Sequence, residues 1–199
     1  MNLQVDWLKS GITDSIEVKQ RILADEALLV RIMDVASHIA SASGQGHRII
    51  FGGNGGSAAD AQHLAAEFVS RFEFDRPGLP ALSLSTDTSM ITAIGNDYGY
   101  ERLFLRQLQA QSKPGDVFVG LTTSGRSPNV LAAFKACKEL GVTSVALCGT
   151  GGPELETLCD HVLRVPSAST PRIQESHILI GHMLCAYVEL QIFGHLKPH

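Results

Sequence analysis

Residues 48–67 read RIIFGGNGGSAADAQHLAAE and decide how the rest of the chain is interpreted. The apolar run 49–51 is typical of a buried strand and is too short for a helix. The glycines that follow allow a sharp turn with positive φ, and Ser57 is a good N-cap for the helix-forming segment 58–68. The stretch therefore predicts a strand, a glycine turn and a helix in direct succession.

This unit combines two features that suit chemistry on a phosphorylated substrate. A glycine loop before a helix presents free backbone N–H groups and the positive end of the helix dipole, which together suit a phosphate. His63 and Glu67 lie four residues apart on the same helix and therefore share a face. Such a pair is most often a solvated pair on a helix surface. Its position beyond a phosphate-type loop favours an acid/base role.

The composition excludes several classes of protein. A chain of 199 residues with a net charge of −4 predicts one domain and argues against a nucleic-acid surface. The N-terminus lacks a signal-peptide pattern, and no apolar run approaches the ~20 residues that span a bilayer. We therefore expect a cytoplasmic protein without membrane or nucleic-acid partners. The four cysteines are Cys137, Cys148, Cys159 and Cys185. They do not occur in the closely spaced pairs typical of metal sites, so we expect them to be reduced thiols.

Residues 1–43 have the apolar spacing of helices. The apolar stripe predicts two helices with a corner near Ala24 and Asp25. A helical region of this length exceeds what an α/β core needs, so we interpret it as an oligomerisation element. The alternative is a helix that folds back on its own sheet.

Residues 47–199 alternate short apolar strands with helices. This alternation predicts an α/β fold with an open five-stranded parallel sheet and helices on both faces. A turn cluster is expected at 95–99. The predicted strands are 49–51, 81–84, 117–121, 142–147 and 162–165; the predicted helices are 58–68, 86–94, 101–111, 129–140, 154–159 and 172–193.

Three loops are expected on one rim, because ligands of such sheets bind beyond the carboxyl ends of the strands. They are 52–57, 85–88 and 122–127. The last of these is rich in hydroxyl groups and opens a helix. Alone it would be an ordinary serine-rich turn; beside the glycine loop it favours a small phosphomonoester. The glycine loop also matches the dinucleotide fingerprint loosely, but Asp87 comes too late for the acidic position, so a dinucleotide stays a minor alternative.

The last predicted helix carries a second set of polar residues in otherwise apolar sequence: Gln174, Glu175, His177 and His182. A buried histidine is usually a hydrogen-bonded core residue. A core role alone does not explain why two histidines and a glutamine occur on the same helix. Periodicity alone does not decide which of them faces a ligand.

Five ordered segments carry a family resemblance: NGGSAADAQH (54–63), FEFDRPGLP (72–80), AIGNDYG (93–99), TSGRS (123–127) and RIQESH (172–177). The chain resembles the sugar isomerase (SIS) domain family nearly end to end, and within it the isomerases of sedoheptulose 7-phosphate. The resemblance implies a single flavodoxin-like SIS domain and a homotetramer with active sites at subunit boundaries. It also implies conversion of sedoheptulose 7-phosphate to D-glycero-D-manno-heptose 7-phosphate, the first step toward the ADP-heptose of lipopolysaccharide.

The resemblance also assigns roles to residues. It implies Glu67 and His182 as the catalytic pair, no nucleotide, and one zinc ion per subunit. The implied zinc ligands are His63, Glu67, Gln174 and His182. The implied substrate contacts are Asn54, Gly55, Gly56, Ser57, Glu67, Asn96, Asp97, Thr122, Thr123, Ser124, Ser127 and Gln174.

Aldose–ketose isomerisation through an enediol needs a base at carbon and an acid at the oxygens. Our hypothesis is that Glu67 abstracts the carbon proton, while His182 shuttles protons at O1 and O2 or opens the sugar ring. The zinc assignment meets a geometric difficulty, because Gln174 and His182 lie about 12 Å apart on a straight helix. They would have to lean together, the helix would have to bend, or one ligand would come from a neighbouring chain.

The main alternative is a non-catalytic SIS tetramer that binds the bacterial replication initiator. In those proteins the positions matching Glu67 and His182 cannot transfer protons, whereas this chain has both residues. A sugar-phosphate-sensing regulator would add a DNA-binding domain, which we do not expect here. The sequence leaves open which chain completes each site and whether His177 supports a site residue.

Overall fold

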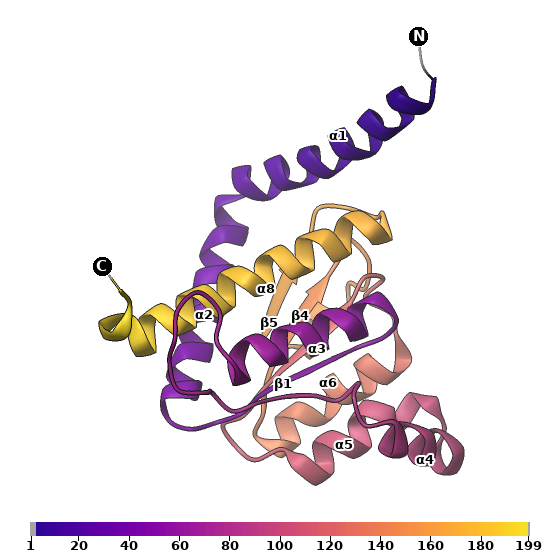
Figure 1. The fold of residues 1–199 in the computed structure, drawn as a ribbon. Helices are drawn as coiled ribbons and strands as arrows, with labels where there is room; N and C mark the ends of the chain where they lie inside the picture. Colours follow the sequence, from indigo (N-terminus) through magenta and orange to yellow (C-terminus); the bar gives the residue numbers. More distant parts are fainter. Residues whose placement is uncertain (1–2, 199) are drawn as a thin grey trace.

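Five parallel strands form one sheet in the order β2-β1-β3-β4-β5. The computed structural model describes residues 3–198 (Figure 1). Residues 1–2 of the predicted N-terminal region and residue 199 of the predicted core lie outside it. The predicted five-stranded α/β fold with its flavodoxin-like order is confirmed. The strands are β1 (Ile49–Gly53), β2 (Ala81–Ser83), β3 (Val117–Thr122), β4 (Thr143–Cys148) and β5 (His161–Arg164).

The direction of winding reverses between β1 and β3. From β1 the chain moves outward to β2 and then returns to β3 on the other side of β1. Gly53 is paired in register with Leu121, so the carboxyl ends of these two strands lie level with each other. The two loops that leave them therefore open onto one crevice, which is the usual ligand position in such sheets.

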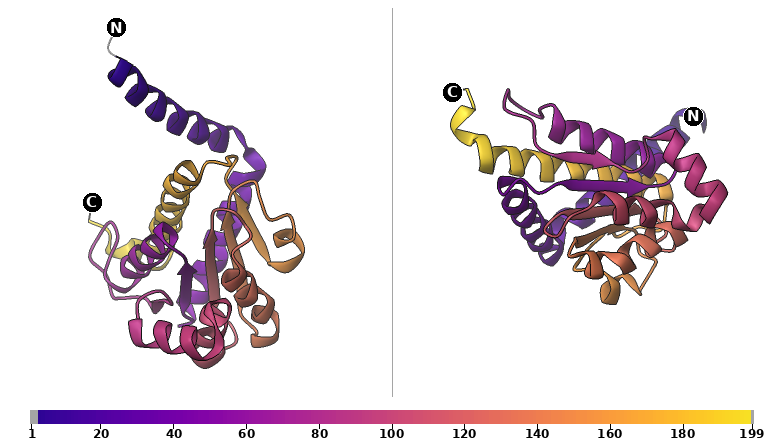
Figure 2. Two further views of the ribbon diagram at one scale, coloured as in Figure 1. Left: turned by 90° about the vertical axis from the view of Figure 1, so that its right-hand side faces the viewer. Right: turned by 90° about the horizontal axis from the view of Figure 1, so that it is seen from below.

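Helices cover both faces of the sheet (Figure 2). Successive strand residues point to opposite faces, so Phe51 and Val119 join one core cluster while Ile50 and Phe118 join the other. The first face is covered by α2 (Glu26–Gly44), α3 (Gly56–Val69) and α8 (Thr170–Phe193). Packed on the second cluster are α4 (Thr88–Tyr98), η1 (Tyr100–Arg102), α5 (Leu103–Gln111), α6 (Pro128–Leu140) and α7 (Leu155–Leu158).

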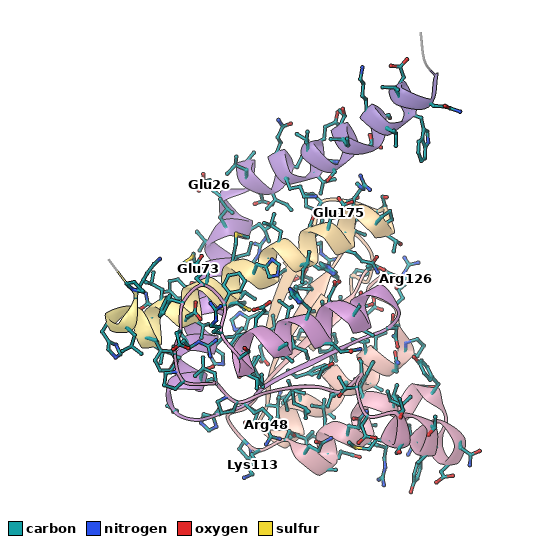
Figure 3. All side chains as sticks on the ribbon, viewed as in Figure 1. Glu26, Arg48, Glu73, Lys113, Arg126 and Glu175 are labelled. Atoms are coloured by element: carbon teal, nitrogen blue, oxygen red, sulfur yellow. The ribbon has the colours of Figure 1, made fainter. Side chains whose placement is uncertain are left out.

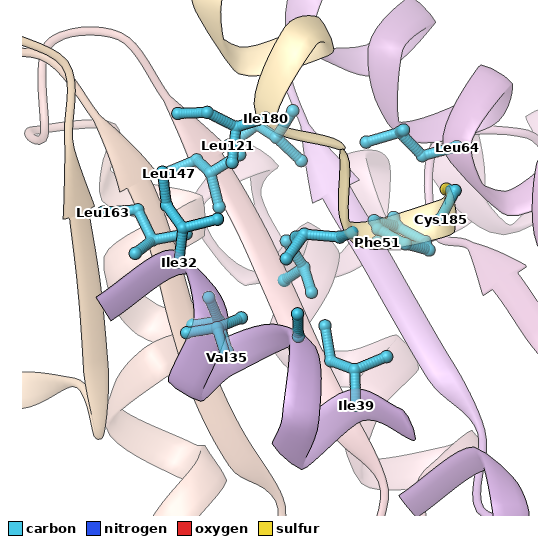
Figure 4. Close-up of a cluster of buried hydrophobic side chains, with 14 of the residues drawn as sticks. Ile32, Val35, Ile39, Phe51, Leu64, Leu121, Leu147, Leu163, Ile180 and Cys185 are labelled. Atoms are coloured by element: carbon cyan, nitrogen blue, oxygen red, sulfur yellow. The ribbon is translucent and has the colours of Figure 1, made fainter. Parts of the chain in front are cut away.

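The larger core cluster joins α2, α3 and α8 to the sheet. Figure 4 shows Val35 and Ile39 of α2 facing the sheet, with Leu64 of α3 and Cys185 of α8 on the same side. Each of these residues is at most 4% exposed. Burial of one such apolar side chain contributes about 1.5–3 kcal/mol, so this contact fixes the two helices that carry the candidate site.

The N-terminal region forms two helices that behave differently. Helix α1 (Leu3–Ala24) ends at the predicted corner, where the Asp25 carboxylate accepts a hydrogen bond from the Leu28 N–H at 2.9 Å and caps α2. Helix α2 packs on the sheet, so the alternative of a folded-back helix holds for this half. Helix α1 extends away from the domain (Figure 1). Its exposed apolar residues are Val5, Trp7, Leu8, Ile12, Ile16 and Leu23.

Two predicted boundaries are wrong. The helix after the glycine loop begins at Gly56, and its N-cap is Gly55, which makes no side-chain hydrogen bond. Ser57, the predicted N-cap, is instead buried in the first turn of the helix. The predicted turn at 95–99 is the end of α4, which continues to Tyr98 before Gly99 adopts φ +83°. A single glycine inside a helix costs only about 1 kcal/mol, so Gly95 alone does not end it. The predicted Asp87 cap is confirmed by its bond to the Met90 N–H.

Helix α8 and the following turn η2 (Gly194–Leu196) are long and apolar enough to cross a membrane by length and composition. The expectation that no apolar run approaches this length is therefore wrong. One face of α8, with Ile180, Leu184 and Val188, is buried against α2, α3 and the sheet, whereas Leu179, Met183 and Leu190 are exposed. This is the pattern of a core helix of the domain.

Candidate active site

Helices α3 and α8 lie side by side and run in the same direction (Figure 1). The side chain of Gln174 lies against Gly56 near the start of both helices, and Leu64 lies against Gly181 farther along. A Cβ built on Gly181 would be 2.5 Å from Cδ2 of Leu64, so this close approach requires a glycine. The same offset brings the C-terminal half of α3 beside the middle section of α8, where the titratable residues lie.

His63, Glu67 and His182 meet in this middle section. Nε2 of His63 is 2.9 Å from Nε2 of His182 and 3.3 Å from Oε1 of Glu67. One donor atom from each of the three residues can be chosen so that all lie within 4.8 Å of one another. The structure thus assembles three of the four residues that the family resemblance assigned to a metal, including both members of the catalytic pair. His63 is exposed, and the other two are partly buried.

Phe72 and Asp60 border this cluster and were missed by the sequence analysis. The ring centroids of Phe72 and His182 are 5.3 Å apart. Asp60 lies one turn before His63 on α3, and among residues 3–198 its buried Oδ2 atom finds no hydrogen-bond partner. Burial raises the pKa of Asp60, while the nearby imidazoles of His63 and His182 act in the opposite direction. Its three-residue spacing from His63 was the available signal.

Gln174 lies at the other end of the site. A Cβ on Gly56 would be 2.5 Å from its Nε2 atom, so the amide packs on the first turn of α3. On α8 it precedes His182 by eight residues, or about 12 Å of helix rise. This position places Gln174 beside the glycine loop. Its assignment as a metal ligand stays a prediction.

The glycine loop is tied to two neighbouring elements through Asn54. The side-chain amides of Asn54 and Asn129 exchange two hydrogen bonds, of 2.9 and 2.8 Å. The Tyr100 hydroxyl donates to Oδ1 of Asn54 at 2.9 Å. Sequence reasoning missed both partners, although Asn129 directly follows the hydroxyl loop at the start of α6. These bonds hold the glycine loop against α6 and η1.

The hydroxyl loop lies beside it, as predicted. Thr122 and Ser127 share a hydrogen bond of 3.1 Å between their hydroxyl groups, and Oγ of Ser124 accepts a hydrogen bond from the Arg126 N–H. Thr123 is partly buried and Ser124 is exposed. Arg126 of this loop, labelled in Figure 3, is exposed and was not singled out from the sequence. The rim therefore offers hydroxyl groups, two helix starts and a cation.

The predicted residues on α4 are less closely tied to the site. Asn96 donates a hydrogen bond to Asp97 at 2.8 Å, and both side chains are exposed. The link from this region to the loops runs through Tyr100. The third predicted loop does reach the rim, because the Ser85 hydroxyl donates to the Gly53 carbonyl at 3.1 Å. Asn96 and Asp97 as substrate contacts stay predictions.

His177 belongs to the core. Its side chain is 0% exposed, and neither ring nitrogen makes a hydrogen bond of normal geometry within the described residues. Burial lowers its pKa to about 4, only partly opposed by the backbone of Cys148. It is therefore a neutral imidazole near neutral pH, whereas His182 on the same helix faces the cluster.

Known proteins with similar sequences and folds identify the family of this chain. The SIS domain family matches residues 13–149. The phosphoheptose isomerase of Aneurinibacillus thermoaerophilus is 58% identical over 188 residues, which cover 94% of this chain and 95% of that protein. The phosphoheptose isomerase of Burkholderia pseudomallei (strain 1710b) is 53% identical over 193 residues, covering 97% and 98% of the two chains.

Solved structures give the same result. A phosphoheptose isomerase from Neisseria gonorrhoeae superposes with a TM-score of 0.87 at 38% identity, covering 94% of this chain and 98% of that one. One from Francisella tularensis superposes with a TM-score of 0.88 at 36% identity, covering 93% and 97%. The chain therefore belongs to the SIS domain family and, within it, to the phosphoheptose isomerases.

Proposed function

We propose that the protein converts sedoheptulose 7-phosphate to D-glycero-D-manno-heptose 7-phosphate by aldose–ketose isomerisation through an enediol. The observation that carries the proposal is the cluster of His63, Glu67 and His182 two turns beyond the phosphate-type loop. The chain belongs to the phosphoheptose isomerases, which supports the same reaction. This reaction would be the first step toward the ADP-heptose of lipopolysaccharide.

The rim is suited to the phosphate group. The starts of α3 and α6 follow the carboxyl ends of β1 and β3, where the positive ends of the helix dipoles favour an anion, and the intervening loop carries the hydroxyl groups of Thr123, Ser124 and Ser127. Gln174 adds an amide at Gly56. These groups carry no net negative charge, so they bind a phosphomonoester without electrostatic opposition.

The cluster is suited to the proton transfers. Glu67 is the base that removes the proton from the carbon next to the carbonyl, and it returns the proton to the neighbouring carbon. His182 exchanges protons with the two oxygens. The contact of 2.9 Å between His182 and His63 lets one ring hold the other in a defined tautomer. General acid–base catalysis of this kind typically accelerates a reaction by about 10²–10⁴-fold.

The donor set fits zinc. Two imidazole nitrogens and one carboxylate oxygen are a common ligand set of catalytic zinc sites, which keep a position open for substrate. The contacts of 2.9 and 3.3 Å are near the edge length of about 3.3 Å expected for a tetrahedron with bonds of about 2.0–2.1 Å. Such an ion, held by His63, Glu67 and His182 with Gln174 as an additional candidate, would polarise the substrate oxygens.

The assembly that we propose is a homotetramer in the cytoplasm. The exposed apolar residues of α1, with Trp7 75% exposed and Leu23 71% exposed, suit burial against other copies of the chain. The four free cysteines are consistent with a reducing compartment. The catalytic pair disfavours the alternative of a non-catalytic tetramer that binds the replication initiator.

The test is turnover of sedoheptulose 7-phosphate by the wild type, Glu67→Gln and Glu139→Gln, each with and without a chelator. Glu139 is an exposed residue of α6 and serves as the matched control. We expect the wild type and the control to turn over substrate and to lose activity on chelation, with zinc restoring it. Loss in Glu67→Gln would support its role as base. A folded wild type that is inactive with zinc would contradict the proposed reaction.

A further inference from the structure

A buried ion pair joins the loop between α3 and β2 to helix α8 and has no part in the proton transfers described above. Arg76 and Glu189 are 8% and 1% exposed, and Nε of Arg76 donates to Oε1 of Glu189 at 2.9 Å. Burial of two charges is costly unless hydrogen bonds satisfy both of them. What the two side chains hold in place is therefore informative.

Arg76 caps the end of α3. Its Nη2 atom donates to the carbonyl oxygen of Glu67 at 2.8 Å, and Nη1 donates to that of Phe68 at 2.7 Å. Nη1 also contacts the carbonyls of Ser70 and Pro77 at 3.3 and 3.0 Å. The last carbonyls of a helix lack partners within it, and a cation there complements the dipole. The guanidinium thus fixes the turn that carries Glu67.

Glu189 connects the same loop to α8. Its carboxylate accepts hydrogen bonds from the N–H groups of Phe72 at 2.8 Å and Glu73 at 2.7 Å. Burial opposes ionisation, but these N–H groups and Arg76 hold the pKa of Glu189 below its ordinary value. Glu189 follows His182 by two turns of α8, and Phe72 stacks near the His182 ring. The carboxylate therefore fixes the loop that flanks His182.

We propose that Arg76 and Glu189 are positioning residues that set the separation between Glu67 on α3 and His182 on α8. The inference rests on the proposed isomerase function. Arg76 contacts the backbone of one catalytic helix, Glu189 belongs to the other, and Glu189 also binds the loop that carries Phe72. The phosphate-type rim lies at the opposite end of both helices, so loosening the pair should lower kcat while leaving KM nearly unchanged.

The first test is Glu189→Gln in the full chain. The glutamine keeps the shape, but its amide nitrogen cannot accept the hydrogen bonds that both carboxylate oxygens receive. We expect kcat to fall at least tenfold with KM within about threefold of the wild type, and the melting temperature to fall as well. Glu73→Gln is the matched control, because it removes an exposed carboxylate from the same loop, paired with Lys197 at 3.4 Å, and keeps the backbone N–H.

Substitution of Arg76 tests the other member of the ion pair and remains decisive if Glu189→Gln does not fold. Lysine keeps a cation at the end of α3 but cannot reproduce the fork of donors, and methionine removes both. We expect kcat to decrease in the order wild type, Arg76→Lys, Arg76→Met. Folded variants with wild-type kcat, or with a loss in KM alone, would overturn the positioning role. An inactive wild type would instead overturn the proposed function.

Discussion

The two ends of helix α3 differ in the chemistry that they offer. At the N-terminal end, Gly56 meets Gln174 among backbone N–H groups and hydroxyls. About 10 Å farther along, His63 and Glu67 meet His182, and the donors are imidazole and carboxylate. One end is suited to hold an anion and the other to move protons. A helix pair thus separates binding from catalysis, and variants at each end should change different kinetic constants.

The largest effect is expected at the catalytic end, from His182→Asn. This change removes the imidazole that exchanges protons with the substrate oxygens, so kcat should fall by about 10²–10⁴-fold with a much smaller change in KM. Steady-state kinetics measures both constants. His195→Asn, an exposed histidine near the C-terminus, is the control. Equal kcat in the two variants would break the proposed division.

A second prediction concerns His177, which lies between the two ends on α8 but faces the core. Its pKa of about 4 lies below the value of 6.5 expected for the unfolded chain, so the unfolded state binds the extra proton between these pH values. The wild type should therefore lose up to about 3 kcal/mol of its free energy of unfolding as the pH falls from 6.5 to 4.

Denaturant unfolding across this pH range measures the effect. In His177→Leu the loss between pH 6.5 and 4 should be reduced, while further loss below pH 4.5 remains, because the depressed pKa of Glu189 makes that carboxylate stabilising only while ionised. Turnover near neutral pH should change little in the folded variant. An unchanged pH profile would mean that His177 is protonated in the folded protein.

At the binding end, Gly56→Ala should raise KM about tenfold with a smaller effect on kcat. A Cβ at this position would lie 2.5 Å from Nε2 of Gln174, so the amide must move from the phosphate-type loop. A tenfold change corresponds to about 1.4 kcal/mol of lost binding. Gly44→Ala is the control, because a Cβ there meets no atom within 4 Å. A selective loss of kcat would reverse the assignment of this end.

The smallest effect is expected for Tyr100→Phe. It removes one hydrogen bond to Asn54, of 2.9 Å, and leaves the bonds between Asn54 and Asn129 in place. A hydrogen bond contributes about 0.5–1.5 kcal/mol, so KM should rise only a few-fold. Tyr98→Phe on the neighbouring helix is a suitable comparison. An unchanged KM would show that η1 does not support the glycine loop.

Much of the fold follows from local sequence. We could predict the five strands, the corner at Asp25 and the Asp87 cap from the sequence. The spacing of apolar residues and the identity of capping residues determine such features within a few neighbouring positions. Ser57 misled the prediction, because glycine at position 55 can also begin a helix and the serine is buried instead. The length of α4 was missed because its single Gly95 is tolerated inside a helix.

The candidate site was predictable only in part. His63 and Glu67 share a helix, so their proximity follows from spacing, and the family resemblance added His182. Asn129, Tyr100, Phe72 and Arg76 reach the site through contacts between elements far apart in the chain, which periodicity does not encode. The position of Gln174 also required the packing of α8 on α3.

The central claim is tested most directly by the affinity of Glu67→Gln for sedoheptulose 7-phosphate, measured by calorimetry beside its turnover. If binding and proton transfer are separated along α3, the variant should bind with a Kd within about threefold of the wild-type KM while its turnover is lost. The nearly isosteric glutamine keeps the packing, so a folded variant is expected. Loss of binding together with turnover, or turnover that persists, would contradict the division.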